Sequence, residues 1–281
     1  MRTFGNIEEK YAVYKDSDIL LQSFPYDGTS TWGKGSDSAF DAFIEASDYL
    51  ELYDIETDSE VFRKGIHLLP EISLEGDPEE VYIKIYERTR ELLENDKLLT
   101  FIGGEHSVSI GIIKAFAEKF NDLTVLHLDA HTDLRPEYMG SPYNHACAMH
   151  EASKNTGLVQ VGIRSMDSSE LEFFNRSKCI FARDMHDNDD WIGRVLPLLG
   201  RDVYISVDMD VFDPSIMPAT GTPEPGGMTW YQALKLLRRV FAGSNVRGFD
   251  LVELAPLDQM KAPAFMMVKL YYKMLSYKYY G

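Results

Sequence analysis

The sequence has few cysteines and lacks any long apolar run. Cys147 and Cys179 are the only cysteines in 281 residues. This count argues against a disulfide scaffold and predicts a reducing, cytoplasmic location. No stretch approaches the roughly 18 consecutive apolar residues of a membrane-spanning helix, and the first residues lack the basic region and apolar core of a signal peptide. We therefore expect neither a membrane partner nor export.

Basic residues are also scarce relative to acidic ones. There are 28 Lys and Arg against 45 Asp and Glu, which gives a formal net charge of −17. Because nucleic acids bind proteins largely through Lys and Arg contacts with phosphates, we expect no nucleic-acid partner. An acidic surface favours the approach of cations, either metal ions or a cationic substrate. Solubility alone is the alternative explanation for this charge.

Short apolar runs alternate with amphipathic segments along the chain, without repeats or linker-like stretches. Strands are predicted at 18–24, 98–103, 123–129, 158–163, 179–182, 203–208 and 246–254. Helices are predicted at 38–50, 77–96, 109–120, 191–199, 229–241 and 262–277. Continuous apolar strands that alternate with helices are typical of a mostly parallel sheet covered on both faces. We predict a single α/β domain over residues 1–281.

Charged motifs stand at the carboxyl ends of predicted strands, where open parallel sheets bind ligands. In "LDAHTDLR", Asp129, His131 and Asp133 occupy alternate positions directly after an apolar strand. Side chains at alternate positions of an extended backbone point to one side, so these three can converge. A polar loop with two turn aspartates is the alternative. His127 lies deeper in the same run, and we interpret it as a hydrogen-bonded core histidine.

Three further strand ends carry similar residues. In "FIGGEHS", His106 follows a glycine turn, although a lone loop histidine is more often structural. In "ISVDMDVFDPS", Asp208 and Asp210 stand two positions apart and would repel each other unless a cation lay between them. In "GFDLVELAP", Glu253 closes the last predicted strand, whereas Asp250 lies deeper and is expected to be structural.

The number of candidate ligands favours two metal ions over one. The motifs supply two imidazoles and four carboxylates: His106, Asp129, His131, Asp133, Asp208 and Asp210. A single tetrahedral zinc ion would use three or four of them and leave several anions unpaired. Two divalent ions sharing bridging carboxylates would use all six, and an oxygen-rich set without thiolates suits Mn²⁺ better than zinc. Water bridging two such ions would be largely hydroxide near neutral pH.

These residues resemble the motifs of the ureohydrolase family, the arginases and agmatinases. The blocks "GGEHS", "DAHTD", "SVDMDVFDPS…GTPEPGG" and "VELAP" occur in the family's order, and the resemblance covers nearly the whole chain. It implies a three-layer α/β/α fold, a pair of Mn²⁺ ions held by the six residues above, and release of urea from a guanidinium compound. It also implies a homo-oligomer, either a trimer or a hexamer.

Within this family the sequence is more similar to agmatinases than to arginases. Glu224 stands in "GTPEPGG", where arginases typically carry an apolar residue. The segment 134–144 lacks the Asn/Ser-rich pattern with which arginases recognise an α-amino acid group. Asn144, where Ser is frequent, and "GSDSAFDAF", where a Gly-Pro pair is commoner, weaken only this subgroup assignment. We predict hydrolysis of agmatine to putrescine and urea for polyamine biosynthesis, with aminopropylagmatine, a guanidino acid or arginine as alternative substrates.

The resemblance also suggests catalytic roles. Asp133 would accept a hydrogen bond from the attacking water, Glu253 would pair with the guanidinium N–H groups, and His145 would act as a proton shuttle. Arg135 facing the pocket would instead favour a carboxylate-bearing substrate, and pairing of Arg135 with Glu137 is expected.

Two hypotheses of other classes compete with this one. A single-metal amide deacetylase would need only an Asp/His/Asp set, and a non-catalytic regulatory paralogue usually loses metal ligands.

Overall fold

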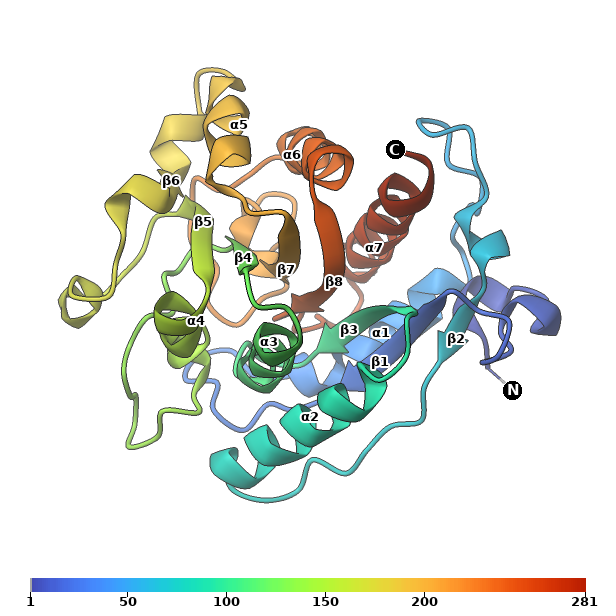
Figure 1. The fold of residues 1–281 in the computed structure, drawn as a ribbon, viewed down its shortest axis with the longest axis horizontal. Helices are drawn as coiled ribbons and strands as arrows, with labels where there is room; N and C mark the ends of the chain where they lie inside the picture. The colour runs from blue at the N-terminus through green and yellow to red at the C-terminus, as the bar shows by residue number, and fades with distance from the viewer. Residues whose placement is uncertain (1) are drawn as a thin grey trace.

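The computed structural model describes residues 2–281, in which eight strands form one sheet. Every strand pairing in this part of the chain is parallel, in the order β2-β1-β3-β8-β7-β4-β5-β6 (Figure 1). The strands are β1 (Ile19–Phe24), β2 (Ile66–Leu68), β3 (Leu98–Gly103), β4 (Leu123–Leu128), β5 (Gly157–Ile163), β6 (Cys179–Phe181), β7 (Asp202–Asp208) and β8 (Asn245–Val252).

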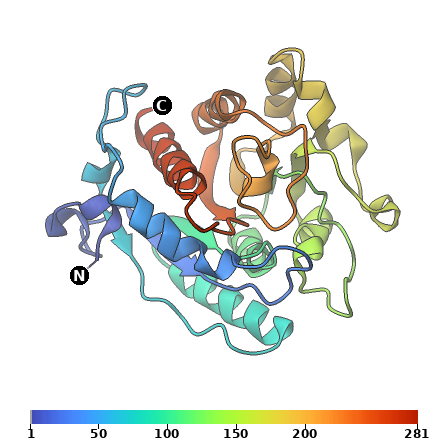
Figure 2. The ribbon, with the colours of Figure 1, turned by 180° about the vertical axis from the view of Figure 1, so that it is seen from behind.

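Helices cover both faces of this sheet (Figures 1 and 2). The α-helices are α1 (Ala39–Ser47), α2 (Pro78–Leu92), α3 (Val108–Lys119), α4 (His150–Asn155), α5 (Asp190–Val195), α6 (Trp230–Gly243) and α7 (Ala262–Tyr280). Helices α2, α3 and α4 pack into one apolar core, and α1, α5, α6 and α7 pack into another. Successive strand residues enter opposite cores, as Tyr204 and Ile205 of β7 do. The three-layer α/β/α expectation is confirmed.

The order of the strands brings four candidate site segments to one place. The chain forms β1 to β3 on one side, crosses to β4, β5 and β6 on the other, and then fills the intervening gap with β8 and β7. Strands β3, β8, β7 and β4 are therefore adjacent. Because all strands are parallel, their carboxyl ends meet at one edge, at the point where the strand order reverses.

Local sequence signals account for most element boundaries. Asp77, predicted as an N-cap, accepts a 2.9 Å hydrogen bond from the Glu80 N–H, and Pro78 occupies the first turn of α2. The three-residue strand β2 and the six-residue helix α4 were not predicted, because such short segments show no clear hydrophobic period. Across residues 2–281, no helix is both long and apolar enough to cross a membrane.

Candidate metal centre

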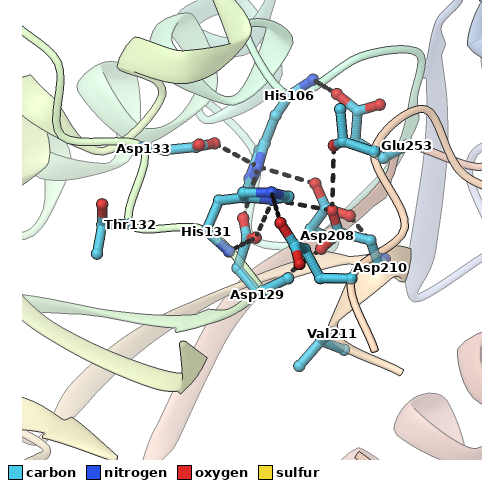
Figure 3. Close-up of polar contacts among 12 residues, drawn as sticks. His106, Asp129, His131, Thr132, Asp133, Asp208, Asp210, Val211 and Glu253 are labelled. Carbon is cyan, nitrogen blue, oxygen red and sulfur yellow. Dashed lines mark hydrogen bonds and ion pairs between the residues drawn. The ribbon is translucent and has the colours of Figure 1, made fainter. Parts of the chain in front are cut away.

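The six candidate metal ligands lie together at the carboxyl ends of β3, β4 and β7 (Figure 3). His106 follows β3 in the turn that leads into α3. Gly104 allows this turn, because a side chain at that position would overlap the backbone of Tyr26. Asp208 is the last residue of β7, and Asp210 follows in a short 3-10 helix.

Four of these residues surround a first candidate cation position, defined by His106, Asp129, Asp133 and Asp208. The His106 Nδ1 atom lies 3.1 Å from Asp129 Oδ2, 3.1 Å from Asp133 Oδ2 and 3.4 Å from Asp208 Oδ2. His106 is 1% exposed, and within residues 2–281 its Nδ1 has no hydrogen-bond partner of proper geometry. A buried imidazole nitrogen facing three carboxylate oxygens fits a divalent cation well.

A second candidate cation position is defined by Asp129, His131 and Asp210. The His131 Nδ1 atom lies 3.0 Å from Asp210 Oδ2 and 3.6 Å from Asp129 Oδ1. Asp129 therefore directs one carboxylate oxygen to each position, as a bridging carboxylate would (Figure 3). The three side chains are close enough to hold one ion, and they fit the predicted pair of divalent ions.

The electrostatics of the cluster show that it attracts positive charge. Burial raises the pKa of Asp208 well above its usual value, and the charges of Asp210 and Asp129 raise it further. Burial alone would lower the pKa of His131, but the adjacent Asp210 and Asp129 carboxylates together raise it to about 12. Protons therefore compete with cations for these groups, and a divalent cation would displace them.

The route by which Asp129, His131 and Asp133 converge differs from the predicted one. Strand β4 ends at Leu128, and Asp133 adopts a left-handed conformation with a φ of 52°. The extended geometry therefore does not continue through this segment. Asp129 faces both cation positions, whereas Asp133 faces only the first and His131 only the second, so the three side chains do not meet at a single point.

His127 is buried and hydrogen-bonded, as predicted. The Gln160 Nε2 amide lies 2.8 Å from the Thr132 carbonyl and 3.0 Å from His127 Nδ1. Because Gln160 donates to Nδ1, the hydrogen of His127 is on Nε2, which donates to Asp129 Oδ2 at 2.7 Å. His127 therefore orients a candidate ligand while both of its own nitrogens are engaged.

Glu253 leaves strand β8 in an unexpected conformation. The strand ends at Val252, one residue before Glu253, which has a left-handed φ of 67°. The Glu253 backbone N–H donates to the Gly104 carbonyl at 2.8 Å, and its Oε1 accepts from the backbone N–H of His106 at 2.7 Å. Burial and then the nearby charge of Glu105 raise the pKa of Glu253 well above its usual value. A cationic group beside this carboxylate would keep it ionised.

His145 lies in a short 3-10 turn next to the segment that follows β1. Its backbone N–H donates to Thr29 Oγ1 at 2.9 Å, and its Nε2 lies 3.4 Å from Thr31 Oγ1. Burial lowers the pKa of His145, and the charge of Asp133 acts in the opposite direction. The adjacent Cys147 is buried, and burial raises the pKa of its thiol to about 12, which fits packing.

One prediction about the surrounding loops was wrong. Arg135 does not pair with Glu137: its Nη2 lies 3.5 Å from Asp167 Oδ2, and its guanidinium stacks 4.5 Å above the Tyr138 ring. On another loop, Glu224 Oε1 lies 3.9 Å from His131 Nε2.

Sequence reasoning also missed the structural importance of Arg164. Its guanidinium Nη2 donates to the carbonyls of Asp210 at 2.6 Å and Glu224 at 2.8 Å. These bonds attach the long loop carrying Glu224 to the end of β7. Arg164 lies in the segment "GIRSM", and nothing in the sequence indicated that it binds carbonyl groups.

Comparison with known proteins gives one consistent result. A model described as "Arginase family" matches residues 17–276. The chain is 34% identical to the N(1)-aminopropylagmatine ureohydrolase of Synechocystis sp., over 96% of this chain and 92% of that protein. It is 33% identical to the agmatinase of Bacillus subtilis, over 93% and 92% respectively. The crystal structure of agmatine ureohydrolase of Thermoplasma volcanium superposes with a TM-score of 0.87 at 30% identity, covering 98% of this chain and 94% of that one.

Proposed function

This chain belongs to the arginase family, and we propose that it is an agmatinase-type ureohydrolase that converts agmatine to urea and putrescine. The observation that carries this proposal is the arrangement of two imidazoles and four carboxylates around two positions that share Asp129. A single-metal deacetylase would not need the second set. A non-catalytic paralogue would not need to retain all six residues together with Glu253.

The six residues would hold two Mn²⁺ ions, with His106, Asp133 and Asp208 at the first position, His131 and Asp210 at the second, and Asp129 at both. Their oxygen-rich chemistry supports Mn²⁺. A pair of divalent cations supplies Lewis-acid activation of water near neutral pH, which hydrolysis of a resonance-stabilised guanidinium requires.

The protein's own groups would bind and orient the substrate. Glu253 is held by the backbone N–H of His106, and its carboxylate can accept hydrogen bonds from the guanidinium N–H groups. Asp133 would accept a hydrogen bond from the attacking water. His145, whose pKa is lowered by burial, is neutral at physiological pH and can accept a proton and return it to the leaving amine.

The environment of Arg135 favours a substrate without a carboxylate. Its guanidinium is already engaged by Asp167 and by the Tyr138 ring. The nearby Glu224 carboxylate and the net charge of −17 attract cations. N(1)-aminopropylagmatine is the second candidate substrate, and it is favoured by the name of the Synechocystis relative. Sequence identity does not distinguish the two substrates. This chain is 34% identical to that relative and 33% identical to the B. subtilis agmatinase.

The decisive experiment measures urea release by Mn²⁺-loaded protein offered agmatine, aminopropylagmatine, arginine and guanidinobutyrate in parallel. We expect strong turnover of one of the two decarboxylated amines and none in Asp208→Ala. Preference for arginine or guanidinobutyrate would contradict the substrate assignment. If the protein released no urea from any of the four substrates, the proposed activity would be contradicted.

We also propose a cytoplasmic homo-oligomer, a trimer or a hexamer. Family membership supports the assembly, and the two free, buried cysteines support a reducing compartment. Light scattering from purified protein measures the number of subunits directly.

A further inference from the structure

A row of buried polar side chains crosses the sheet beneath the candidate metal centre. In the strand register, Gln160 of β5 is paired with His127 of β4, His127 with Ser206 of β7, and Ser206 with Asp250 of β8. All four side chains are at most 3% exposed. Neither the substrate nor the cations require them as ligands, yet a buried polar row is costly unless each member is satisfied.

The Ser206–Asp250 half of this row is connected to His106. The His106 Nε2 atom lies 3.0 Å from Ser206 Oγ, and Ser206 Oγ lies 2.7 Å from Asp250 Oδ1. The other carboxylate oxygen of Asp250 accepts from the hydroxyls of Tyr204 at 2.7 Å and Ser109 at 3.0 Å. Asp250 is thus surrounded by three hydroxyl donors.

The direction of these hydrogen bonds follows from the donors available. An ionised carboxylate has no hydrogen to give, so the single hydroxyl hydrogen of Ser206 must point to Asp250. The Ser206 oxygen is then left to accept, and His106 must carry its hydrogen on Nε2. When a cation occupies the first position His106 is neutral, and its only lone pair is on Nδ1, which faces Asp129, Asp133 and Asp208.

We propose that the row Gln160–His127–Ser206–Asp250 sets the hydrogen positions of two metal ligands. Asp250 acts through Ser206 to hold His106 with its Nδ1 lone pair directed at the first cation position. Gln160 acts through His127 to direct an N–H at Asp129 Oδ2. All four are positioning residues, and this inference rests on the proposed function only in requiring that cations bind at the centre.

Asp250→Asn is the sharpest test, because it keeps the shape of the side chain. The hydroxyls of Tyr204 and Ser109 face one oxygen of the Asp250 carboxylate, and the hydroxyl of Ser206 faces the other. In the asparagine variant, the amide oxygen should therefore lie on the side of Tyr204 and Ser109. Its NH₂ group would then donate to Ser206, whose hydrogen would turn to His106 Nε2 and force a hydrogen onto Nδ1. Ser206→Ala removes the acceptor instead, and Ser206→Thr retains it.

Binding of Mn²⁺ is measured by calorimetry, and the magnetic coupling of the ion pair by electron paramagnetic resonance. We expect about 10- to 100-fold weaker binding and loss of the coupled signal in Asp250→Asn and Ser206→Ala, with binding restored in Ser206→Thr. Gln160→Leu should also weaken binding, since Asp129 serves both positions. Tyr204→Phe, which removes a donor to the same carboxylate outside the relay, should bind Mn²⁺ within about threefold of wild type.

Equal Mn²⁺ affinity in Asp250→Asn and Tyr204→Phe, whether lowered or unchanged, would overturn the proposed relay. Unchanged affinity in a Ser206→Ala variant that still unfolds near the wild-type temperature would overturn it independently. Wild-type protein that binds Mn²⁺ but releases no urea would contradict the proposed function and leave this test intact.

Discussion

The side chain of Glu253 accepts a 2.7 Å hydrogen bond from the backbone N–H of His106, although the two residues are 147 positions apart. The bond joins the segment after β8 to the segment after β3, and it fixes one carboxylate oxygen beside the candidate metal centre. The orientation of Glu253 therefore depends on the main chain that carries a candidate metal ligand, and its charge remains available to a substrate.

The substitution Glu253→Gln removes the negative charge of this side chain but should keep its hydrogen bond from His106. A glutamine oxygen can still accept the His106 hydrogen bond, so we expect bound Mn²⁺ to remain at the wild-type level. The loss of the negative charge opposite a guanidinium should lower kcat/KM for agmatine by about 10²- to 10³-fold, or about 3–4 kcal/mol. Steady-state kinetics and metal analysis on one preparation check this. A comparable loss of metal would indicate that Glu253 acts on the cations.

The shared carboxylate of Asp129 predicts different metal contents for different substitutions. Asp133→Ala should weaken the first cation position alone and Asp210→Ala the second alone, leaving about one ion per chain in each variant. Asp129→Ala should reduce occupancy of both. Elemental analysis after dialysis against limiting Mn²⁺ distinguishes these patterns, and equal losses in all three variants would argue against two separate positions.

Because His145 must be neutral to accept a proton, we expect kcat to fall at acidic pH. Burial lowers its pKa below the usual value of 6.5, so the neutral form that can accept a proton is present at neutral pH and is lost as the pH falls through that lowered pKa. At saturating Mn²⁺, His145→Asn should lower kcat by about 10²-fold, and added imidazole should restore part of it. An unchanged kcat would assign the proton transfer to another group.

A buried ion cluster attaches the loop after α1 to helix α7, away from the metal centre. Lys273 Nζ lies 3.0 Å from Asp54 Oδ2 and 2.5 Å from Glu56 Oε2, and both the Lys273 and Asp54 side chains are buried. Lys273→Met leaves these carboxylates without their cation, and we expect the free energy of unfolding to fall by about 3 kcal/mol. The exposed Lys261–Glu45 pair provides the control, since Lys261→Met should leave the free energy of unfolding nearly unchanged.

The stabilisation that Lys273 provides should decrease at low pH. Burial acts to raise the pKa of Asp54, but bonds from the Thr57 backbone and Lys273 outweigh it and lower the pKa overall. A lowered folded-state pKa contributes stability above the unfolded value of about 3.9, and that stability is lost as the pH falls through the folded value. Urea unfolding at pH 7 and pH 3 should therefore show a smaller difference between wild type and Lys273→Met at the lower pH.

A structural feature of this protein can be predicted from the sequence when the residues that determine it are close together in the chain. The six candidate ligands could be found because strand ends are visible as apolar runs followed by polar residues. Their division between two cation positions could not be found, because it depends on the left-handed backbone of Asp133. The pairing of Arg135 with Asp167 also escaped prediction, since the two residues belong to different loops.

The buried polar row illustrates the same limit more clearly. Gln160, His127, Ser206 and Asp250 each look like an isolated polar residue within an apolar strand. Only the register of four neighbouring strands places them in line. Asp250 was expected to be structural, and the side chain that its carboxylate controls through Ser206 belongs to a segment more than 140 residues earlier.

The position of β7 and β8 between β3 and β4 has a consequence for the newly made chain. Synthesis proceeds from the N-terminus, so β1 to β6 leave the ribosome before the two strands that join them. Until then the edges of β3 and β4 lack the neighbours that they have in the folded protein, and such edges can pair with other chains. The last strands to be made both close this gap and deliver Asp208, Asp210 and Glu253. A chain that stops before β7 can therefore neither finish its sheet nor assemble a binuclear centre, which delays metal capture until synthesis is nearly complete.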